Sequence, residues 1–141
     1  MRDFANNIDV KRGLSPVAAV TDNTPFVSQI LDTKGLDGAA FIILCGALTD
    51  ANATFTTLFE DGNDSGLSDH AAVDDQFLIG TEAKASFDFS ADNKVFKIGY
   101  VGPKRYVRVT ITPAGNDSGN IFLAGAWVTQ PLDLPAANPP A

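Results

Sequence analysis

The chain has 141 residues, of which 45% are hydrophobic and 19% are charged, and its formal net charge is −7. This apolar content excludes a disordered chain, because enough surface can be buried to offset the entropy that folding costs. The excess of acids disfavours non-specific nucleic-acid binding, since the chain would approach phosphates against charge repulsion. We therefore expect one globular protein that does not bind nucleic acid directly.

The sequence contains neither a secretion signal nor a membrane span. The N-terminal residues MRDFANNIDVKRG lack the apolar core of a signal peptide. The longest apolar stretch, residues 39–48, is about half as long as a membrane span. Cys45 is the single cysteine, so an internal disulfide is impossible. We expect a soluble protein that is not secreted by a classical route and has no membrane partner.

Apolar and polar residues alternate with a period of two, in runs bounded by Gly, Pro, Asn and Asp, which predicts antiparallel strands. The runs are 25–32, 39–46, 53–60, 76–80, 84–89, 94–102, 104–112 and 120–129. No apolar stripe has helical spacing, so we expect no crossover helices. The sequence therefore predicts an all-β fold, an antiparallel β-sandwich of the jelly-roll type, with a barrel as the alternative.

The alternation also predicts which side chains form the core. The inward side chains should pack against the strand that carries Trp127, and they are Phe55, Phe59, Phe87, Val107, Val109 and Ile111. In the run 120–129 both sets of alternating residues are apolar or small: Ile121, Leu123, Gly125 and Trp127 on one face, Phe122, Ala124, Ala126 and Val128 on the other. This strand is predicted to be buried on both faces.

Both ends of the chain lack such runs, apart from a short apolar stretch at 17–20. The tail PLDLPAANPPA contains four of the eight prolines, which cannot build the interior of a sheet or helix. We predict an N-terminal arm at 1–24, a sandwich domain at 25–130 and a Pro-rich C-terminal tail at 131–141. Such extended arms either pack on their own domain or contact a neighbouring subunit, and we expect the sandwich to fold without residues 1–12 or 131–141.

No residues match a catalytic motif. His70 is the single histidine and lies beside Ser68 and Asp69, and adjacent residues of one loop cannot form a hydrolase triad. Cys45 lies in an apolar run, where a free thiol behaves as a small buried hydrophobe. No phosphate-binding glycine loop is present. We therefore expect no enzymatic activity, no catalytic or metal-binding residues and no cofactor.

Residues 60–75 form an acidic segment without Lys or Arg. The letters DGNDSG at 61–66 are similar to the start of a calcium loop, but position 12 is Ala72 instead of the bidentate Glu. We predict a solvated loop whose Asx and Gly residues form turns, with a cation site of another geometry as the alternative. The acids are Glu60, Asp61, Asp64, Asp69, Asp74 and Asp75.

Positive charge is concentrated between residues 94 and 108, where no acid occurs. Two adjacent strands, 94–102 and 104–112, would then carry a basic stripe. This separation of charge suits self-association or docking on an oppositely charged partner, and a solvated basic face is the alternative. Together with the basic residues of the N-terminal arm, the candidate capsid or subunit contacts are Arg2, Lys11, Arg12, Lys94, Lys97, Lys104, Arg105 and Arg108.

Six segments resemble a family of small proteins encoded in the head-morphogenesis region of tailed phages and prophages. They are SPVAAVTDNT (15–24), VSQI (27–30), DTKG (32–35), KIGYVG (97–102), KRYVR (104–108) and TIT (110–112). The resemblance spans residues 1–130 and leaves the tail from Pro131 unmatched. Its motifs are structural, so it implies a virion role but no active-site residues.

The resemblance implies a head decoration (cement) protein, which stabilises the capsid without doing chemistry. Its partners would be the major capsid protein and further copies of itself in a homotrimer. It would reside on the capsid surface of the virion, and in the host cytoplasm during assembly. The alternative is a carbohydrate-binding or host-recognition sandwich of a head or tail fibre, which needs exposed aromatic platforms. Since Trp127 is predicted to be buried, Tyr100 and Tyr106 would have to serve.

Overall fold

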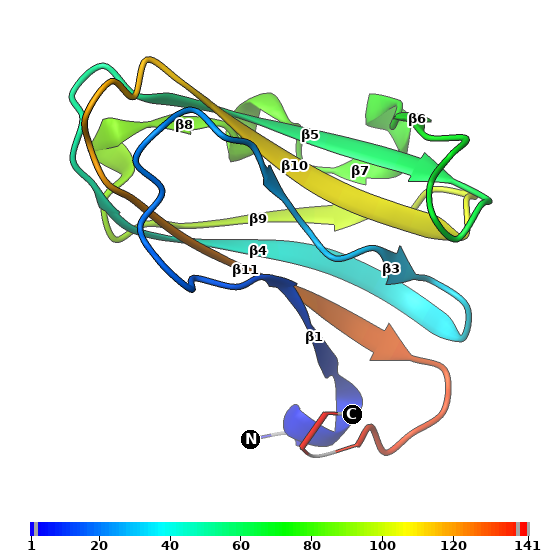
Figure 1. Ribbon diagram of the computed structural model, residues 1–141. Helices are drawn as coiled ribbons and strands as arrows, with labels where there is room; N and C mark the ends of the chain where they lie inside the picture. Colours follow the sequence, from blue (N-terminus) through cyan, green and yellow to red (C-terminus); the bar gives the residue numbers. More distant parts are fainter. Residues whose placement is uncertain (2, 138, 141) are drawn as a thin grey trace.

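The computed structural model describes residue 1, residues 3–137 and residues 139–140, and it consists of two packed antiparallel β-sheets (Figure 1). Sheet A contains β1 (Asp9–Leu14), β4 (Leu36–Leu48), β7 (Leu78–Ile79), β9 (Val95–Tyr100) and β11 (Ile121–Pro131). Sheet B contains β2 (Phe26–Val27), β3 (Leu31–Asp32), β5 (Thr54–Gly62), β6 (Ala71–Ala72), β8 (Phe87–Asp88) and β10 (Tyr106–Ala114). Short 3₁₀ turns lie at η1 (Ala5–Asn7), η2 (Asp75–Phe77), η3 (Ala83–Ala85) and η4 (Phe89–Ala91).

The strand order confirms the jelly-roll prediction. Sheet A has the order β1-β11-β4-β9-β7, and sheet B has the order β2-β10-β5-β6. β3 extends the β2 edge by pairing with β10, and β8 pairs with β5 on the opposite edge. From β1 to β5 and again from β9 to β11, the chain alternates between the two sheets, which nests the antiparallel pairs inside one another as in a jelly roll.

The core lies between the sheets and is centred on Trp127. Its ring makes edge-on contacts with Phe41 at 4.8 Å and with Phe59 at 6.1 Å between ring centroids. The Phe41 ring lies against Gly125, where an added Cβ would be 2.6 Å from the ring, so only glycine fits there. Every predicted inward residue is buried except Phe87, which is half-buried at the margin and stacks on Phe55 at 4.8 Å.

Two predicted strands are largely replaced by 3₁₀ turns. The segment 76–80 begins in η2 and pairs with β9 only through β7, and 84–89 is divided among η3, β8 and η4. Side-chain caps explain these turns, because the carboxylates of Asp74 and Asp88 accept hydrogen bonds from the backbone N–H groups of Gln76 and Ser90. Local capping competes here with the sheet ladder.

The N-terminal segment 1–24 contains a strand that its sequence pattern does not reveal. β1 pairs with β11 from Asp9 opposite Thr129 to Leu14 opposite Gly125, so it forms an edge of sheet A. Further along, Val20 makes an isolated bridge with Ile121. Residues 9–14 therefore belong to the sandwich and are not part of a free arm.

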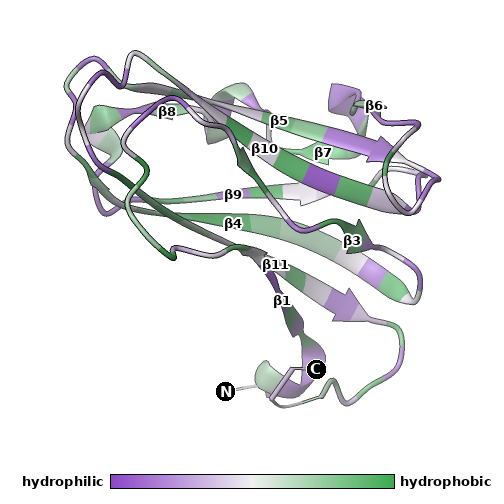
Figure 2. Ribbon diagram, in the orientation of Figure 1, coloured by the Kyte–Doolittle hydropathy of each residue, from purple (hydrophilic) through white to green (hydrophobic). Residues whose placement is uncertain are grey.

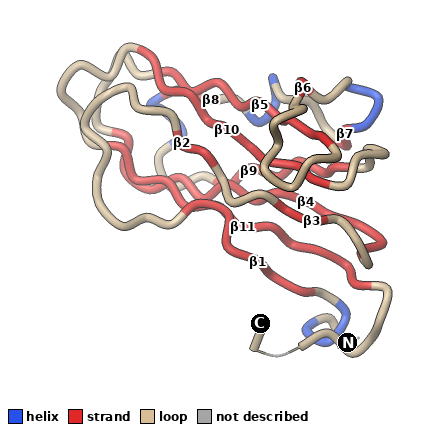
Figure 3. Tube along the Cα trace, turned by 45° about the vertical axis from the view of Figure 1, so that its right-hand side comes forward, coloured by secondary structure: helices blue, strands red, loops and turns tan. Residues whose placement is uncertain are grey.

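The segment that contains η1 and the segment that follows β11 lie side by side near the start of β1 (Figures 1 and 3). The backbone N–H of Ala136 donates a hydrogen bond of 2.7 Å to the carbonyl of Asn6, which ties the tail to η1. Nearer the sheet, the N–H of Leu132 donates to the carbonyl of Gly35 at 2.9 Å. The tail thus packs on its own chain at two points.

Candidate docking surface

The outer face of sheet A is uncovered and largely apolar, with the exposed Lys97 opposite Ile42 and the exposed Arg12 opposite Ala126 on the same face. Register aligns Ala124, Leu44 and Val95 in one row across the sheet, and Phe122 lies over Gly46 beside that row. The exposed fractions are 48% for Leu44, 59% for Val95 and 42% for Phe122. We call this surface the apolar face; its outward residues are Ile42, Leu44, Val95, Phe122, Ala124 and Ala126.

Sheet B presents a different outer face. Threonines alternate with buried residues along β5 and β10, and Arg108 lies opposite Glu60 in the register. Hydrophilic bands interrupt both strands, whereas β4 is hydrophobic or neutral over most of its length (Figure 2). An antiparallel sheet with one solvated face normally has polar residues there. Sheet B follows this rule and sheet A does not. The sequence predicts that both faces of β11 are buried, but in the isolated chain its outer face is left uncovered.

A shallow groove of about 440 Å³ continues the outer face of sheet A toward the end of β9. Small residues form its floor, because register aligns Ala40 with Gly99 between the larger side chains of Val128 and Ile79. Lys97 lies on its rim. We call this feature the groove; its lining includes Gly38, Ala40, Lys97, Gly99, Ile79 and Val128.

The predicted basic stripe does not exist. Lys97 lies on β9 in sheet A, whereas Arg108 lies on the outer face of sheet B, because the chain crosses between the sheets after Tyr100. Lys104 and Arg105 lie in that crossing segment, and Lys94 precedes β9 at its other end. On the other edge of sheet A, β1 carries the exposed Lys11 and Arg12, and Arg2 lies outside the described residues. The candidate contacts are thus spread over several surfaces.

Several of these cations are already paired with acids of the same chain. Arg105 binds the carboxylate of Asp32 through two hydrogen bonds of 2.9 Å, and these bonds lower the pKa of Asp32 to about 2. Arg108 contacts Glu60 at 3.3 Å, and the other oxygen of Glu60 lies 2.6 Å from Nδ1 of His70. Lys97 makes no ion pair with any described residue.

The acidic segment uses its carboxylates to hold turns. Asp64 accepts hydrogen bonds from the backbone N–H groups of Gly66 and Ser68, and Asp69 accepts from those of Asn63 and Asp64. These bonds lower the pKa values of both aspartates. Within the described part of the chain, no three His, Cys, Asp or Glu side chains form a group that could hold a metal ion.

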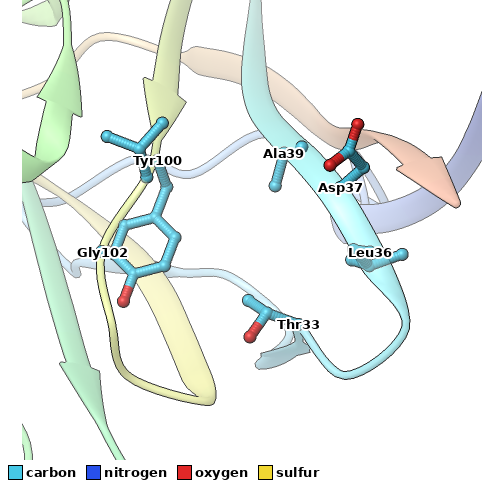
Figure 4. A pocket seen from close by; sticks show the side chains of 8 residues that line it. Thr33, Leu36, Asp37, Ala39, Tyr100 and Gly102 are labelled. Carbon is cyan, nitrogen blue, oxygen red and sulfur yellow. The ribbon is translucent and has the colours of Figure 1, made fainter. Parts of the chain in front are cut away.

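A small pocket of about 240 Å³ lies between the β3–β4 turn and the end of β9 (Figure 4). Thr33 and Asp37 line one side and Tyr100 lines the other. Gly102 packs on the Tyr100 ring, where an added Cβ would be 2.5 Å from the ring carbons. The pocket is smaller than the usual range for small-molecule sites, about 300–1,000 Å³.

The aromatic side chains offer little platform for a sugar. Trp127 and Tyr100 are both buried, which removes Tyr100 from the two predicted platforms. Tyr106 is half-buried, and the Arg105 guanidinium lies 5.0 Å from its ring centroid. Cys45 is also buried, and burial raises the pKa of its thiol to about 11. None of the helices among the described residues is long and apolar enough to cross a membrane.

The fold class is a jelly-roll β-sandwich, and the comparisons with known proteins support this fold class. No protein-family model and no curated protein matches the chain. Among solved structures, the PBSX exported protein XepA matches with a TM-score of 0.52 and 10% identity, over 93% of this chain and 39% of that one. This chain therefore spans well under half of XepA, and the likeness is one of fold.

Carbohydrate-binding modules are among the more distant matches. The xylan-binding module CBM15 has a TM-score of 0.41 and 13% identity, over 92% of this chain and 94% of the module. CBM62 from Clostridium thermocellum Xyl5A has a TM-score of 0.40 and 16% identity, over 79% and 73% of the two chains. These likenesses carry no weight for function.

Proposed function

We propose that the protein is a structural virion protein that decorates and stabilises the head of a tailed phage, and that it does so without chemistry. The observation that carries this proposal is the apolar face, which is apolar like a buried surface and yet uncovered. Large exposed apolar patches mark interaction sites in soluble proteins. The sequence resemblance to phage head-region proteins supports a capsid as the partner, and the fold likeness to the PBSX exported protein XepA supports only the broader class of phage structural proteins.

The size of the face suits attachment in many copies. Strands are spaced about 4.8 Å apart and rise about 3.3 Å per residue, so the three strands that carry the apolar face offer, over six residues, a footprint of roughly 300 Å². A stable interface takes about 800 Å² from each partner, so one copy alone would bind weakly. On a symmetric lattice, however, copies that also contact one another gain avidity. A decoration protein can therefore use a modest apolar face.

The alternative of carbohydrate recognition has less support. Sugar binding in a sandwich needs exposed aromatic rings, and here Trp127 and Tyr100 are buried. The outer face of sheet B is polar, but Arg108, Glu60 and His70 are already engaged with one another there. We therefore retain capsid decoration as the single proposal.

The test is attachment to heads of the phage that encodes the chain, assembled without it. Leu44→Asp and Phe122→Asp place a charge on the apolar face, and Thr56→Asp places the same charge on the outer face of sheet B. We expect the first two variants to lose occupancy and the third to bind like the parent, with all three melting normally. Equal occupancy of all variants, or no binding by the parent, would refute the proposal.

A further inference from the structure

The C-terminal segment forms an exposed apolar projection. The backbone bonds from Leu132 to Gly35 and from Ala136 to Asn6 fix it at both ends. Between these points the exposed fractions of Leu132 and Leu134 are 64% and 52%, with the acidic Asp133 between them. We call residues 132–134 the knob. The exposure of two leucine side chains to water is unfavourable in free energy. Contact with another surface would remove this cost.

The groove has the complementary properties. Its floor at Gly38 and Ala40 leaves room that leucine side chains can occupy beside Val128, whereas the Ile79 side chain leans over Gly99. On its rim, the Lys97 ammonium makes no ion pair with the described residues, and neither does the Asp133 carboxylate. The groove thus offers an apolar floor and a cation, the knob offers apolar side chains and an anion, and neither charge is paired within the described part of the chain.

Two backbone hydrogen bonds tie the knob to its own chain. The two anchors connect it to the β3–β4 turn and to η1, which precedes β1 (Figure 1). A second copy can present its knob with these anchors intact.

We propose that the knob of one copy docks in the groove of the next, with Leu132 and Leu134 over Gly38 and Ala40 and with Asp133 paired to Lys97. The two surfaces differ, so the contact is heterologous and is repeated from copy to copy. If the repeated contact closes on itself by rotation, the copies form a ring. The homotrimer expected from the sequence is the smallest such ring with more than two copies. The contact is small, so the association depends on protein concentration.

Full-length variants in solution, without phage heads, test this arrangement. Leu132→Asp together with Leu134→Asp spoils the knob, and Ala40→Phe fills the groove; all three positions point away from the core. Thr56→Phe on sheet B is the matched control. By sedimentation velocity, the parent and the control associate at high micromolar concentration, and each of the other variants raises the dissociation constant at least tenfold while melting normally.

Mixing the two defective variants provides the sharper result. The knob variant keeps its groove and the groove variant keeps its knob, so the mixture forms a 1:1 heterodimer and nothing larger. A parent that stays monomeric, a knob or groove variant that associates like the parent, or a mixture that stays monomeric would each overturn the proposal. Capsid attachment is measured separately, so this proposal and the proposed function can fail independently.

Discussion

The hydroxyl of Tyr100 donates a hydrogen bond of 2.8 Å to Oδ2 of Asp61. Tyr100 is the last residue of β9 in sheet A and Asp61 lies near the end of β5 in sheet B, so this bond joins the two sheets. Both residues are buried. Burial raises the pKa of Tyr100, and the hydrogen bond to Asp61 and its charge raise it further.

Tyr100→Phe should therefore destabilise the protein. It leaves the buried Asp61 carboxylate without its tyrosine donor, and a hydrogen bond to a charged group contributes about 1.5–3 kcal/mol. We expect the free energy of unfolding, measured in urea, to fall by about that amount. Tyr106→Phe, on the half-buried tyrosine at the surface, is the control and should change it little. Equal small effects of both variants would contradict the structural role of the bond.

Two phenylalanines that stack on each other should differ in their contribution to stability. Phe55 is fully buried, so Phe55→Ala should cost about 3–5 kcal/mol in unfolding free energy. Phe87 is half-buried at the margin, and the cavity left by Phe87→Ala opens to solvent. We expect its cost to be clearly smaller. Chemical denaturation of both variants measures which loss of unfolding free energy is larger. A larger loss for Phe87→Ala would contradict the assignment of Phe55 to the core and of Phe87 to its margin.

Acid should remove the contribution of Asp32. The Arg105 hydrogen bonds lower the pKa of Asp32 to about 2 in the folded protein, below its ordinary value near 3.8. The unfolded chain therefore binds this proton first, and the stabilisation is complete above pH 4 and is lost as pH falls through 2. In thermal melts, the difference between the parent and Asp32→Asn should shrink across this window. A difference independent of pH would show that the ion pair is not formed in solution.

The N-terminal strand should be required for full stability, contrary to the expectation from sequence. Removing residues 1–14 deletes β1 and exposes the ladder groups of β11, which β1 covers as the edge strand. We expect a clearly lower melting temperature and a tendency to aggregate. Removing residues 1–4, which precede η1, is the control. If both truncations melt like the parent, β1 contributes nothing to the sheet in solution.

The sequence correctly predicted the strands that have one buried face and one exposed face. In β5 and β10 the alternation of buried and exposed residues is regular, so their inward side chains follow from period alone. β1 was missed because an edge strand with the sequence DVKRGL has mostly exposed side chains and no apolar alternation. The basic stripe was wrong because period identifies a strand but does not say to which sheet it belongs, and Lys97 and Arg108 lie on different sheets.

The docking surface was only half visible in the sequence. The apolar residues on both faces of β11 correctly marked an unusual strand, but they could not show which face is left uncovered. That distinction depends on the packing of Trp127 against sheet B, a contact between residues far apart in the chain. Likewise, the groove arises from Ala40 and Gly99 becoming neighbours only when β4 and β9 pair.

A cryo-electron microscopy reconstruction of decorated phage heads would test the central claim most directly, because it shows which face of the sandwich meets the capsid. We expect the outer face of sheet A to point inward, with Leu44, Val95 and Phe122 in contact with the capsid shell and with sheet B facing solvent. A reconstruction in which these three side chains face solvent, or in which sheet B meets the shell, would contradict the claim.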